Sequence, residues 1–245
     1  MDLTIVDDYE ALSREAADLA ALLVSVDPSA AIVVATGHSP MGMYQELAER
    51  RQRGELDTSQ LRIFQLDEYL GIGPDDPRSL FSWMERSFLT PLGIAASQVM
   101  RLPGDAEHPE VVCRAYDQAV QAAGGFDLAI LGLGPNGHLG FNEPPSYPDA
   151  PTRVVALAPE SVASNRRYFG GEHEIPARAL TAGMATLLGA KRTLLLVSGE
   201  RKRDILRRTV EGPQTPGIPA SYLQRASKVT VIADRAAAGS LQAAR

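Results

Sequence analysis

The segment DLAILGLGPNGHLGFNEPPS (127–146) holds the residues best suited to move protons. His138 and Glu143 lie five positions apart in a loop that carries glycine at positions 132, 134, 137 and 140. An imidazole that titrates near neutral pH and is oriented by a carboxylate is a common proton-transfer pair. Glycines at this density indicate that the backbone must approach another group closely. The sequence therefore nominates His138 with Glu143 as a candidate catalytic pair, although a single histidine more often has a structural role.

The string GLGPNG (132–137) also satisfies the G-x-G-x-x-G pattern of dinucleotide-binding folds. The context opposes that interpretation, because the motif lies in mid-chain and Pro144 and Pro145 would end any long helix after it. No acidic residue ends a following strand about 20 residues further on, where such folds place one. We therefore expect no nicotinamide cofactor at this loop.

A second acidic motif, FQLDEYLG (64–71), places Asp67 and Glu68 at the end of an apolar run. Asp67 is positioned to point into a ligand crevice and to act as a general base. Its carboxyl group has an ordinary pKa of about 4 unless burial removes water from it. An exposed acidic pair that begins a loop explains these two residues equally well.

A phosphate group would suit the segment ATGHSPMGMY (35–44). The turn of Gly37, His38 and Ser39 precedes a helix, and backbone N–H groups of such a turn and of a helix N-terminus point toward an anion. An ordinary N-terminal helix cap explains the same residues, so this segment alone does not decide between the two interpretations.

A cationic segment, GERKRD (199–204), is the second candidate for phosphate binding. Arg201, Lys202 and Arg203 crowd a predicted first helical turn, where positive charge opposes the helix dipole unless an anion is bound. Only three of the 24 basic residues are lysines, so a lysine here suggests a compact charge for a phosphate. The usual explanation of such a cluster is a solvated charged face.

The apolar pattern predicts the strands and helices that must position these motifs. Helical spacing recurs in residues 12–23, 40–51, 109–123 and 200–210, while runs rich in Ile, Leu and Val predict strands at 31–36, 61–66, 126–134, 192–199 and 228–234. The strands lack a clean alternation, which favours burial on both faces. We therefore predict an α/β fold of three layers, a doubly wound, Rossmann-like and mainly parallel sheet covered by helices, in one domain spanning residues 1–245.

All four polar clusters follow predicted strands. In open parallel sheets, ligands bind beyond the carboxyl ends of the strands. We therefore expect the residues after strands 31–36, 61–66, 126–134 and 192–199 to meet in one site. This shared position is stronger evidence for a site than any of the motifs taken alone.

The same segments resemble a known family. GLGPNGHLGFNEP looks like the signature segment of glucosamine-6-phosphate deaminases, FQLDEYLG is similar to their second motif, and ATGHSPMGMY resembles their phosphate loop. Segments 164–170, 179–202 and 219–234 match the family pattern in order, so the resemblance covers most of the chain from about residue 31. The related 6-phosphogluconolactonases share the glycine-rich loop and its histidine but usually lack the FNEP and DEY strings.

The resemblance implies an isomerising deaminase that converts glucosamine-6-phosphate, or its C4 epimer, and water to a ketose 6-phosphate and ammonia. It implies that Asp67 is the base at the sugar C2 and that His138 with Glu143 opens the pyranose ring. The implied phosphate ligands are Gly37, His38, Ser39, Arg167 and Lys202. Because none of these steps requires a metal, nicotinamide or pyridoxal phosphate, we expect no cofactor and no metal.

Two residues depart from the family pattern, and two alternatives stay open. Asn136 stands where some members place an aspartate in the ring-opening group, so Glu143 alone would orient His138, and His38 stands where a small or hydroxyl residue is common. A lactone hydrolase of the same fold would use His138 without needing an amino group on its substrate. A non-catalytic sugar-phosphate sensor would need no base at C2, so the presence of Asp67 argues against it.

Composition narrows the partners and the compartment. The net charge of −6 provides no basic field for nucleic acid or for an anionic membrane, and no stretch approaches the roughly 18 apolar residues of a membrane span. One cysteine, Cys113, and no recognisable signal peptide favour the reducing cytoplasm. The expected partner is a small amino-sugar phosphate. A homo-oligomer stays open, although the short alanine-rich tail predicts no C-terminal extension that would build one.

Overall fold

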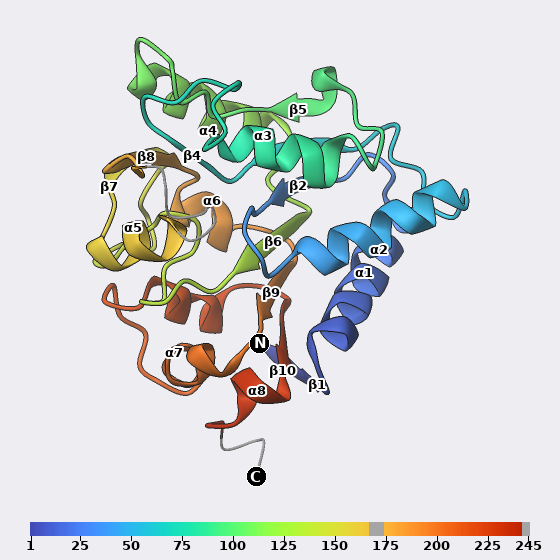
Figure 1. The fold of residues 1–245 in the computed structure, drawn as a ribbon, viewed down its shortest axis with the longest axis vertical. Coiled ribbons are helices and arrows are strands. Elements are labelled where there is room, and N and C mark those ends of the chain that lie inside the picture. Colours follow the sequence, from blue (N-terminus) through green and yellow to red (C-terminus); the bar gives the residue numbers. More distant parts are fainter. Residues whose placement is uncertain (167–173, 242–245) are drawn as a thin grey trace.

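A central seven-stranded sheet organises the computed structural model, which describes residues 1–166 and 174–241 (Figure 1). The strand order is β1–β10–β9–β6–β2–β3–β5, and every neighbouring pair is parallel. The strands are β1 (Asp2–Val6), β2 (Ala31–Val34), β3 (Arg62–Gln65), β5 (Val99–Met100), β6 (Leu128–Gly132), β9 (Thr193–Val197) and β10 (Val229–Asp234). The predicted α/β class with a mainly parallel sheet is therefore confirmed.

Helices cover both faces of this sheet, because its strands bury alternate side chains in two separate cores. In β2, Ala31 and Val33 face one core, whereas Ile32 and Val34 face the other. The second core lies against α1 (Tyr9–Val26), α2 (Met41–Gln52) and α3 (Leu80–Met84), which continues as a π-helical turn over Glu85–Leu89. The first core lies against α4 (Pro109–Ala122), α6 (Met184–Leu188), α7 (Arg203–Val210), α8 (Arg235–Ala238) and the 3₁₀ turn Pro219–Arg225.

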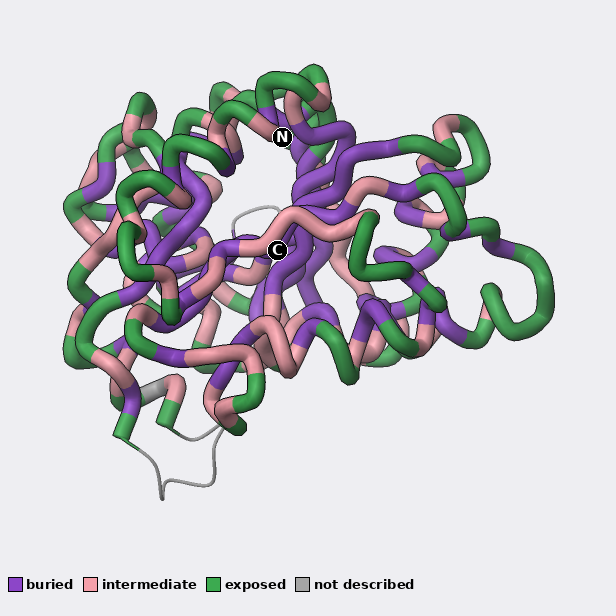
Figure 2. The backbone as a smooth tube through the Cα atoms, turned by 90° about the horizontal axis from the view of Figure 1, so that it is seen from above, coloured by how far each residue is buried: buried purple, intermediate pink, exposed green. Residues whose placement is uncertain are grey.

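Burial follows the same layers. The tube in Figure 2 is buried along the central strands and exposed mainly on helices and connecting loops. Of two further 3₁₀ turns, Ala96–Gln98 leads into β5 and Glu200–Lys202 lies between β9 and α7. Within residues 1–166 and 174–241, no helix combines the length and the apolar character that crossing a bilayer demands.

A second, three-stranded antiparallel sheet lies beside the first, and the sequence analysis did not predict it. Its order is β4 (Asp67–Tyr69), β8 (Arg178–Thr181) and β7 (Arg153–Ala156), with α5 (Pro159–Arg166) following β7 (Figure 1). Asp67 and Glu68 therefore form a strand of their own instead of ending the preceding one. Strands of three or four residues are too short to carry a recognisable alternation of apolar and polar residues.

The order of the large sheet reverses between β2 and β6. From β2 the chain adds β3 and β5 on one side, and from β6 it adds β9 and β10 on the other. The loops that leave the carboxyl ends of β2 and β6 consequently diverge and leave a crevice, which is where open α/β sheets bind ligands. The phosphate-loop candidate follows β2 and the glycine-rich loop follows β6, so the expected meeting of these motifs is confirmed.

Glu68 joins the small sheet to α3 through a cluster of buried hydrogen bonds. The residue is 2% exposed, and its carboxylate accepts bonds from Ser79 Oγ and from the backbone N–H groups of Tyr69, Leu80 and Phe81, all at 2.9 Å. The side-chain amide of Gln65 donates a further bond at 3.2 Å. Burial raises the pKa of Glu68, and these donors act in the opposite direction by favouring the anion.

We expect Glu68→Gln to lower the free energy of unfolding by about 3 kcal/mol, because an NH₂ group would replace one oxygen and leave buried donors without an acceptor. Urea denaturation followed by the fluorescence of Trp83, the one tryptophan, measures this change. The exposed Glu85→Gln on the adjoining helical turn is the matched control and should change stability by less than about 0.5 kcal/mol. Equal effects of the two substitutions would show that the Glu68 cluster contributes nothing specific.

Candidate active site

A cavity of about 220 Å³ lies at the carboxyl ends of β2, β6 and β9. Six of the nine residues nominated from the sequence line it: Gly37, His38, Ser39, Asp67, His138 and Lys202. Asn136 and Glu143 are not part of the lining but contact His138, as described below. Arg167, nominated as a phosphate ligand, lies outside the described residues. The cavity therefore brings together candidates that lie up to 165 positions apart in the sequence, from position 37 to position 202.

The glycine-rich loop after β6 allows His138 to lie against its own backbone. A Cβ atom at position 134 would overlap the imidazole ring of His138, so only glycine leaves room for the ring there. The backbone N–H of Gly134 donates to the carbonyl of His138 at 3.0 Å, which closes the loop beneath the ring. The imidazole is thus fixed at the cavity wall with a side-chain exposure of 13%.

Glu143 contacts Nδ1 of His138 and accepts a hydrogen bond from Asn136. Oε2 of Glu143 lies 3.3 Å from Nδ1 of His138 and accepts a bond of 2.7 Å from Nδ2 of Asn136. Oδ1 of Asn136 accepts from the backbone N–H of His138 at 3.3 Å. Asn136 therefore contacts Glu143 directly, as an amide donor and not as a second carboxylate.

Ser161, from α5, completes this network and was not identified from the sequence. Its Oγ lies 3.3 Å from Nδ1 of His138, and the residue is fully buried. Burial alone would raise the pKa of Glu143, but the hydrogen bond and charge of His138, with the bonds from Ser161 and Asn136, lower it to about 2. Glu143 is therefore an anion at any working pH, and its negative charge lies beside the imidazole.

The carboxyl group of Asp67 differs from that of Glu143 in its hydrogen bonding and in the direction of its pKa shift. Asp67 is 6% exposed, and among the described residues its carboxylate accepts no hydrogen bond. Burial, with the nearby negative charge of Glu68, raises the pKa of Asp67 to about 8. A carboxylate that is desolvated and lacks donors is a strong base for its type, so the geometry supports the role of proton acceptor.

The other end of the cavity carries a half-buried cation. Lys202 donates from Nζ to the carbonyl of Leu133 at 2.5 Å, and burial lowers the pKa of its ammonium group to about 8. The turn after β2 faces it, where Gly37 has a φ of 104° that favours glycine. This turn is anchored by Tyr9, whose hydroxyl donates to the carbonyl of His38 at 2.7 Å and accepts from the N–H of Gly42 at 2.9 Å. An anion between the turn and Lys202 would meet backbone donors and a positive charge.

The cationic cluster GERKRD divides in the structure. Arg201 is exposed, and Arg203 turns away to pair with Glu200 at 2.8 Å and to donate to the carbonyl of Ala236. Only Lys202 of the three basic residues lines the cavity. Residues 200–202 form a 3₁₀ turn ahead of α7, so Lys202 caps that helix instead of lying within its first turn.

Several cavity residues gave no signal in the sequence. The lining includes Tyr69, Leu80, Trp83, Phe141, Asn165 and Ser198. Trp83 packs edge-on to His38, with ring centroids 6.3 Å apart, and its indole N–H donates to the sulfur of Met41. Tyr69, Leu80, Trp83 and Asn165 come from β4, α3 and α5, beside the small sheet that the sequence did not predict, whereas Phe141 and Ser198 lie in the loops after β6 and β9. Over the described part of the chain, no group of three His, Cys, Asp or Glu side chains is arranged to hold a metal ion.

Comparison with known proteins identifies relatives along the whole chain. The family model described as glucosamine-6-phosphate isomerases/6-phosphogluconolactonase matches residues 7–232. The chain is 38% identical to a glucosamine-6-phosphate deaminase of Thermoanaerobacter sp. (strain X514), over 97% of this chain and 94% of the relative. It is 41% identical to one of Streptomyces avermitilis, over 100% and 94% respectively.

Solved structures agree with these relatives. A structure described as a monomeric glucosamine-6-phosphate deaminase superposes with a TM-score of 0.95 at 38% identity, and covers 98% of this chain and 100% of its own. The 6-phosphogluconolactonase of Trypanosoma brucei shares the fold, with a TM-score of 0.80 at 17% identity over 98% of both chains.

Because the pKa of Asp67 is raised, we expect Asp67→Asn to stabilise the folded protein by an amount that grows as the pH rises. The folded protein holds the proton up to about pH 8, whereas an unfolded chain releases it near 3.8, so wild-type stability is lost as the pH rises between these values. Asparagine has no such proton. We expect the melting temperature of the variant to match wild type near pH 4 and to exceed it by about 5 °C at pH 9. Calorimetry measures both, with the exposed Asp75→Asn as control; a difference that does not grow with pH would refute the raised pKa.

Proposed function

The chain belongs to the family of glucosamine-6-phosphate isomerases and 6-phosphogluconolactonases, and we propose that within this family it works as a glucosamine-6-phosphate deaminase. It converts glucosamine-6-phosphate and water to fructose-6-phosphate and ammonia. The observation that carries this proposal is the presence of two differently tuned proton carriers in one cavity, a donor-free Asp67 and a His138 backed by an anionic Glu143.

His138 opens the sugar ring in this proposal. Opening a hemiacetal moves a proton from the C1 hydroxyl to the ring oxygen, and an imidazole can carry that proton because it both accepts and donates near neutral pH. The anionic Glu143 stabilises the positive charge that the ring carries between the two transfers. Asn136 and Ser161 keep Glu143 and the imidazole aligned during the exchange.

Asp67 then isomerises the open chain. Its carboxylate removes the proton from C2 and returns it to C1, while one proton of the ammonium group passes to the C1 oxygen. The C1 aldehyde thereby becomes a hydroxymethyl group, and C2 becomes a protonated imine. Water adds to this imine, and loss of ammonia leaves the ketone of fructose-6-phosphate. The substrate amine, as an ammonium group beside Asp67, lowers the pKa of the carboxyl and makes the base available where the empty cavity would keep it protonated.

The phosphate lies between Lys202 and the turn Gly37–Ser39. Burial lowers the pKa of Lys202 to about 8, which means that its ammonium form is poorly stabilised. A phosphate dianion beside it would stabilise that charged form. This end of the cavity fixes the sugar at a distance from C2, which is how binding energy from a non-reacting group orients a reacting one. Arg167 remains a predicted further ligand of the phosphate.

A substrate panel tests this function. With chelator present, we expect ammonia release from glucosamine-6-phosphate or from its C4 epimer, at a kcat on the order of 1–10³ s⁻¹. Asp67→Asn should lower kcat by at least about 10²-fold with little change in substrate affinity, because a base acts mainly in the transition state. Turnover of 6-phosphogluconolactone without turnover of either amino sugar would establish the lactonase alternative instead.

Asn136→Asp tests the ring-opening network. The new carboxylate would lie where an amide now donates to Glu143 at 2.7 Å, so a second negative charge beside His138 would favour the protonated imidazole. In a plot of kcat/KM against pH, we expect the fall in activity on the acidic side (the acid limb) to shift to higher pH by about one unit. Activity should be lower at pH 6 and little changed at pH 8.

Asn136→Ser is the matched control, since it removes the amide donor without adding a charge. An acid limb that moves equally in both variants would mean that the lost hydrogen bond, and not the added carboxylate, controls His138. A limb that moves in neither variant would mean that residue 136 does not affect the proton carrier.

A further inference from the structure

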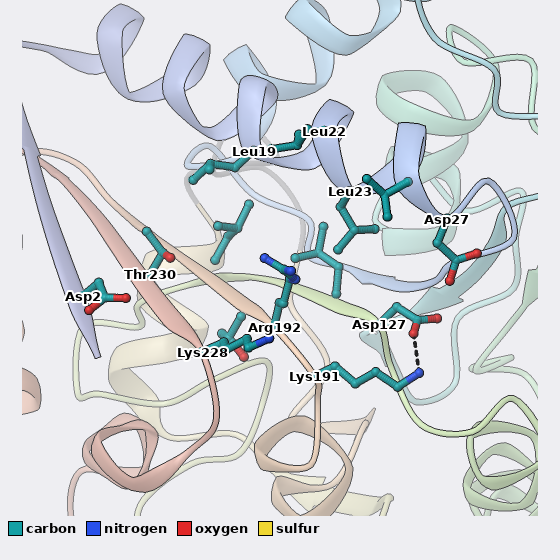
Figure 3. Close-up of a pocket in the computed structure, with 14 residues that line it drawn as sticks. Asp2, Leu19, Leu22, Leu23, Asp27, Asp127, Lys191, Arg192, Lys228 and Thr230 are labelled. Carbon is teal, nitrogen blue, oxygen red and sulfur yellow. Dashed lines mark hydrogen bonds and ion pairs between the residues drawn. The ribbon is translucent and has the colours of Figure 1, made fainter.

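A second and larger cavity lies at the opposite edge of the central sheet (Figure 3). Its volume is about 520 Å³, and it opens between the C-terminal half of α1 and the amino ends of β1, β10, β9 and β6. It shares no lining residue with the cavity that holds Asp67 and His138. Cavities of this size accommodate small organic molecules, so the question is which chemistry this one would select. We call it the distal cleft.

The helix side of the distal cleft is apolar. Leu19, Leu22, Leu23 and Val26 of α1 line the distal cleft on one side, and Leu128 and Leu194 line it from the sheet. Leu22 is 62% exposed and Val26 is 79% exposed, although α1 already anchors itself through other, fully buried residues such as Leu12 and Ala16. Large apolar side chains that contribute little to the core mark a surface that gains from burial against an apolar group.

Two exposed cations, Arg192 and Lys228, line the sheet side of the distal cleft. Arg192 extends from the start of β9 toward α1, and Lys228 lies at the start of β10 (Figure 3). Among the described residues, neither side chain forms a hydrogen bond or an ion pair. The third basic residue, Lys191, differs because it pairs with Asp127 at 2.6 Å.

The acids of the distal cleft do not neutralise Arg192. Asp127 is held by Lys191 and by the N–H of Ala31 at 2.8 Å, and Asp27 accepts from the N–H and hydroxyl of Ser29. Asp27 and Asp2 lie at the two ends of the distal cleft, with Arg192 between them (Figure 3). An anionic group placed centrally would therefore meet positive charge first.

The backbone at Lys228 supports a use for its side chain. It has a φ of 42°, and it is the one residue other than glycine with positive φ in the part of the chain that the structure describes. Glycine or asparagine adopts this conformation with less strain. A chain with only three lysines nevertheless places one here, which indicates that the ammonium group has a role.

We propose that the distal cleft binds a small amphipathic anion, an aryl or short acyl group that bears a carboxylate, sulfonate or phosphate. The apolar body lies against Leu19, Leu22 and Val26. The acidic group lies on Arg192 and Lys228. This site is independent of the deaminase reaction and of the residues that carry it.

Two matched fluorescent probes test the apolar and anionic halves of the proposal separately. The first, 8-anilinonaphthalene-1-sulfonate, carries an apolar body and an anion, and the second, N-phenyl-1-naphthylamine, is the same body without the sulfonate. We expect the sulfonate to bind one molecule per chain and the neutral probe to bind about tenfold more weakly. Methyl NMR spectra should show shifts at Leu19, Leu22, Leu23 and Val26 on addition of the sulfonate.

Variants locate the site. Arg192→Ala should weaken sulfonate binding about tenfold, and Lys228→Gly about fivefold, with no effect on the neutral probe. Lys228→Gly should keep its stability, because glycine relieves the positive φ, so loss of binding there cannot be attributed to unfolding. Leu22→Asp, at an exposed position, should abolish binding of both probes.

The control variants are Arg207→Ala, which removes an exposed cation on α7, and Lys202→Met in the first cavity; neither should change sulfonate affinity. Sulfonate binding that survives Arg192→Ala and Lys228→Gly, or that is lost in Lys202→Met, would overturn the proposal. Concentration-dependent dimerisation that Leu22→Asp abolishes, with no saturable probe binding, would identify a second copy of the chain as the occupant and would also overturn it.

Discussion

The carboxylate of Glu68 accepts hydrogen bonds from β4, from the end of β3 and from the start of α3, and the acidic side of the cavity depends on this interaction. It connects the strand that carries Asp67 to the helix that carries Trp83. Burial raises the pKa of both carboxyl groups, but hydrogen bonds oppose that rise at Glu68, whereas none of the described residues donates to the carboxylate of Asp67.

The two ends of the cavity carry groups of opposite charge, Asp67 and Lys202. Asp67 and Lys202 both have a pKa of about 8, one raised and the other lowered by burial, so each is poorly stabilised in its charged form when the cavity is empty. An amino-sugar phosphate brings an ammonium group and a phosphate, which compensate the two ends together. A ligand that lacks one of these charges leaves one end uncompensated, which gives a physical basis for selectivity without a large number of contacts.

The strands of the main sheet and the meeting of the motifs could be predicted from sequence, because buried parallel strands are continuous apolar runs and their carboxyl ends share one edge. The small sheet could not, since the pattern in Asp67–Tyr69 is three residues long and its partner Arg178–Thr181 follows more than 100 positions later. Ser161 and Asn136 show the same limit in the site. Their roles depend on which atom of Glu143 or His138 they face, and that is set by tertiary packing and not by local spacing.

The contact between Gly134 and the imidazole of His138 also constrains how this protein can change over generations. Any side chain at position 134 would push the ring away from Glu143, so a substitution there removes the proton carrier without touching it. Position 138 can vary first, because a smaller residue leaves space above Gly134, but position 134 cannot vary while the imidazole is kept. A lineage that adopts a different chemistry in this cavity must therefore lose the histidine before the glycine, and the order of those two steps is fixed by van der Waals contact alone.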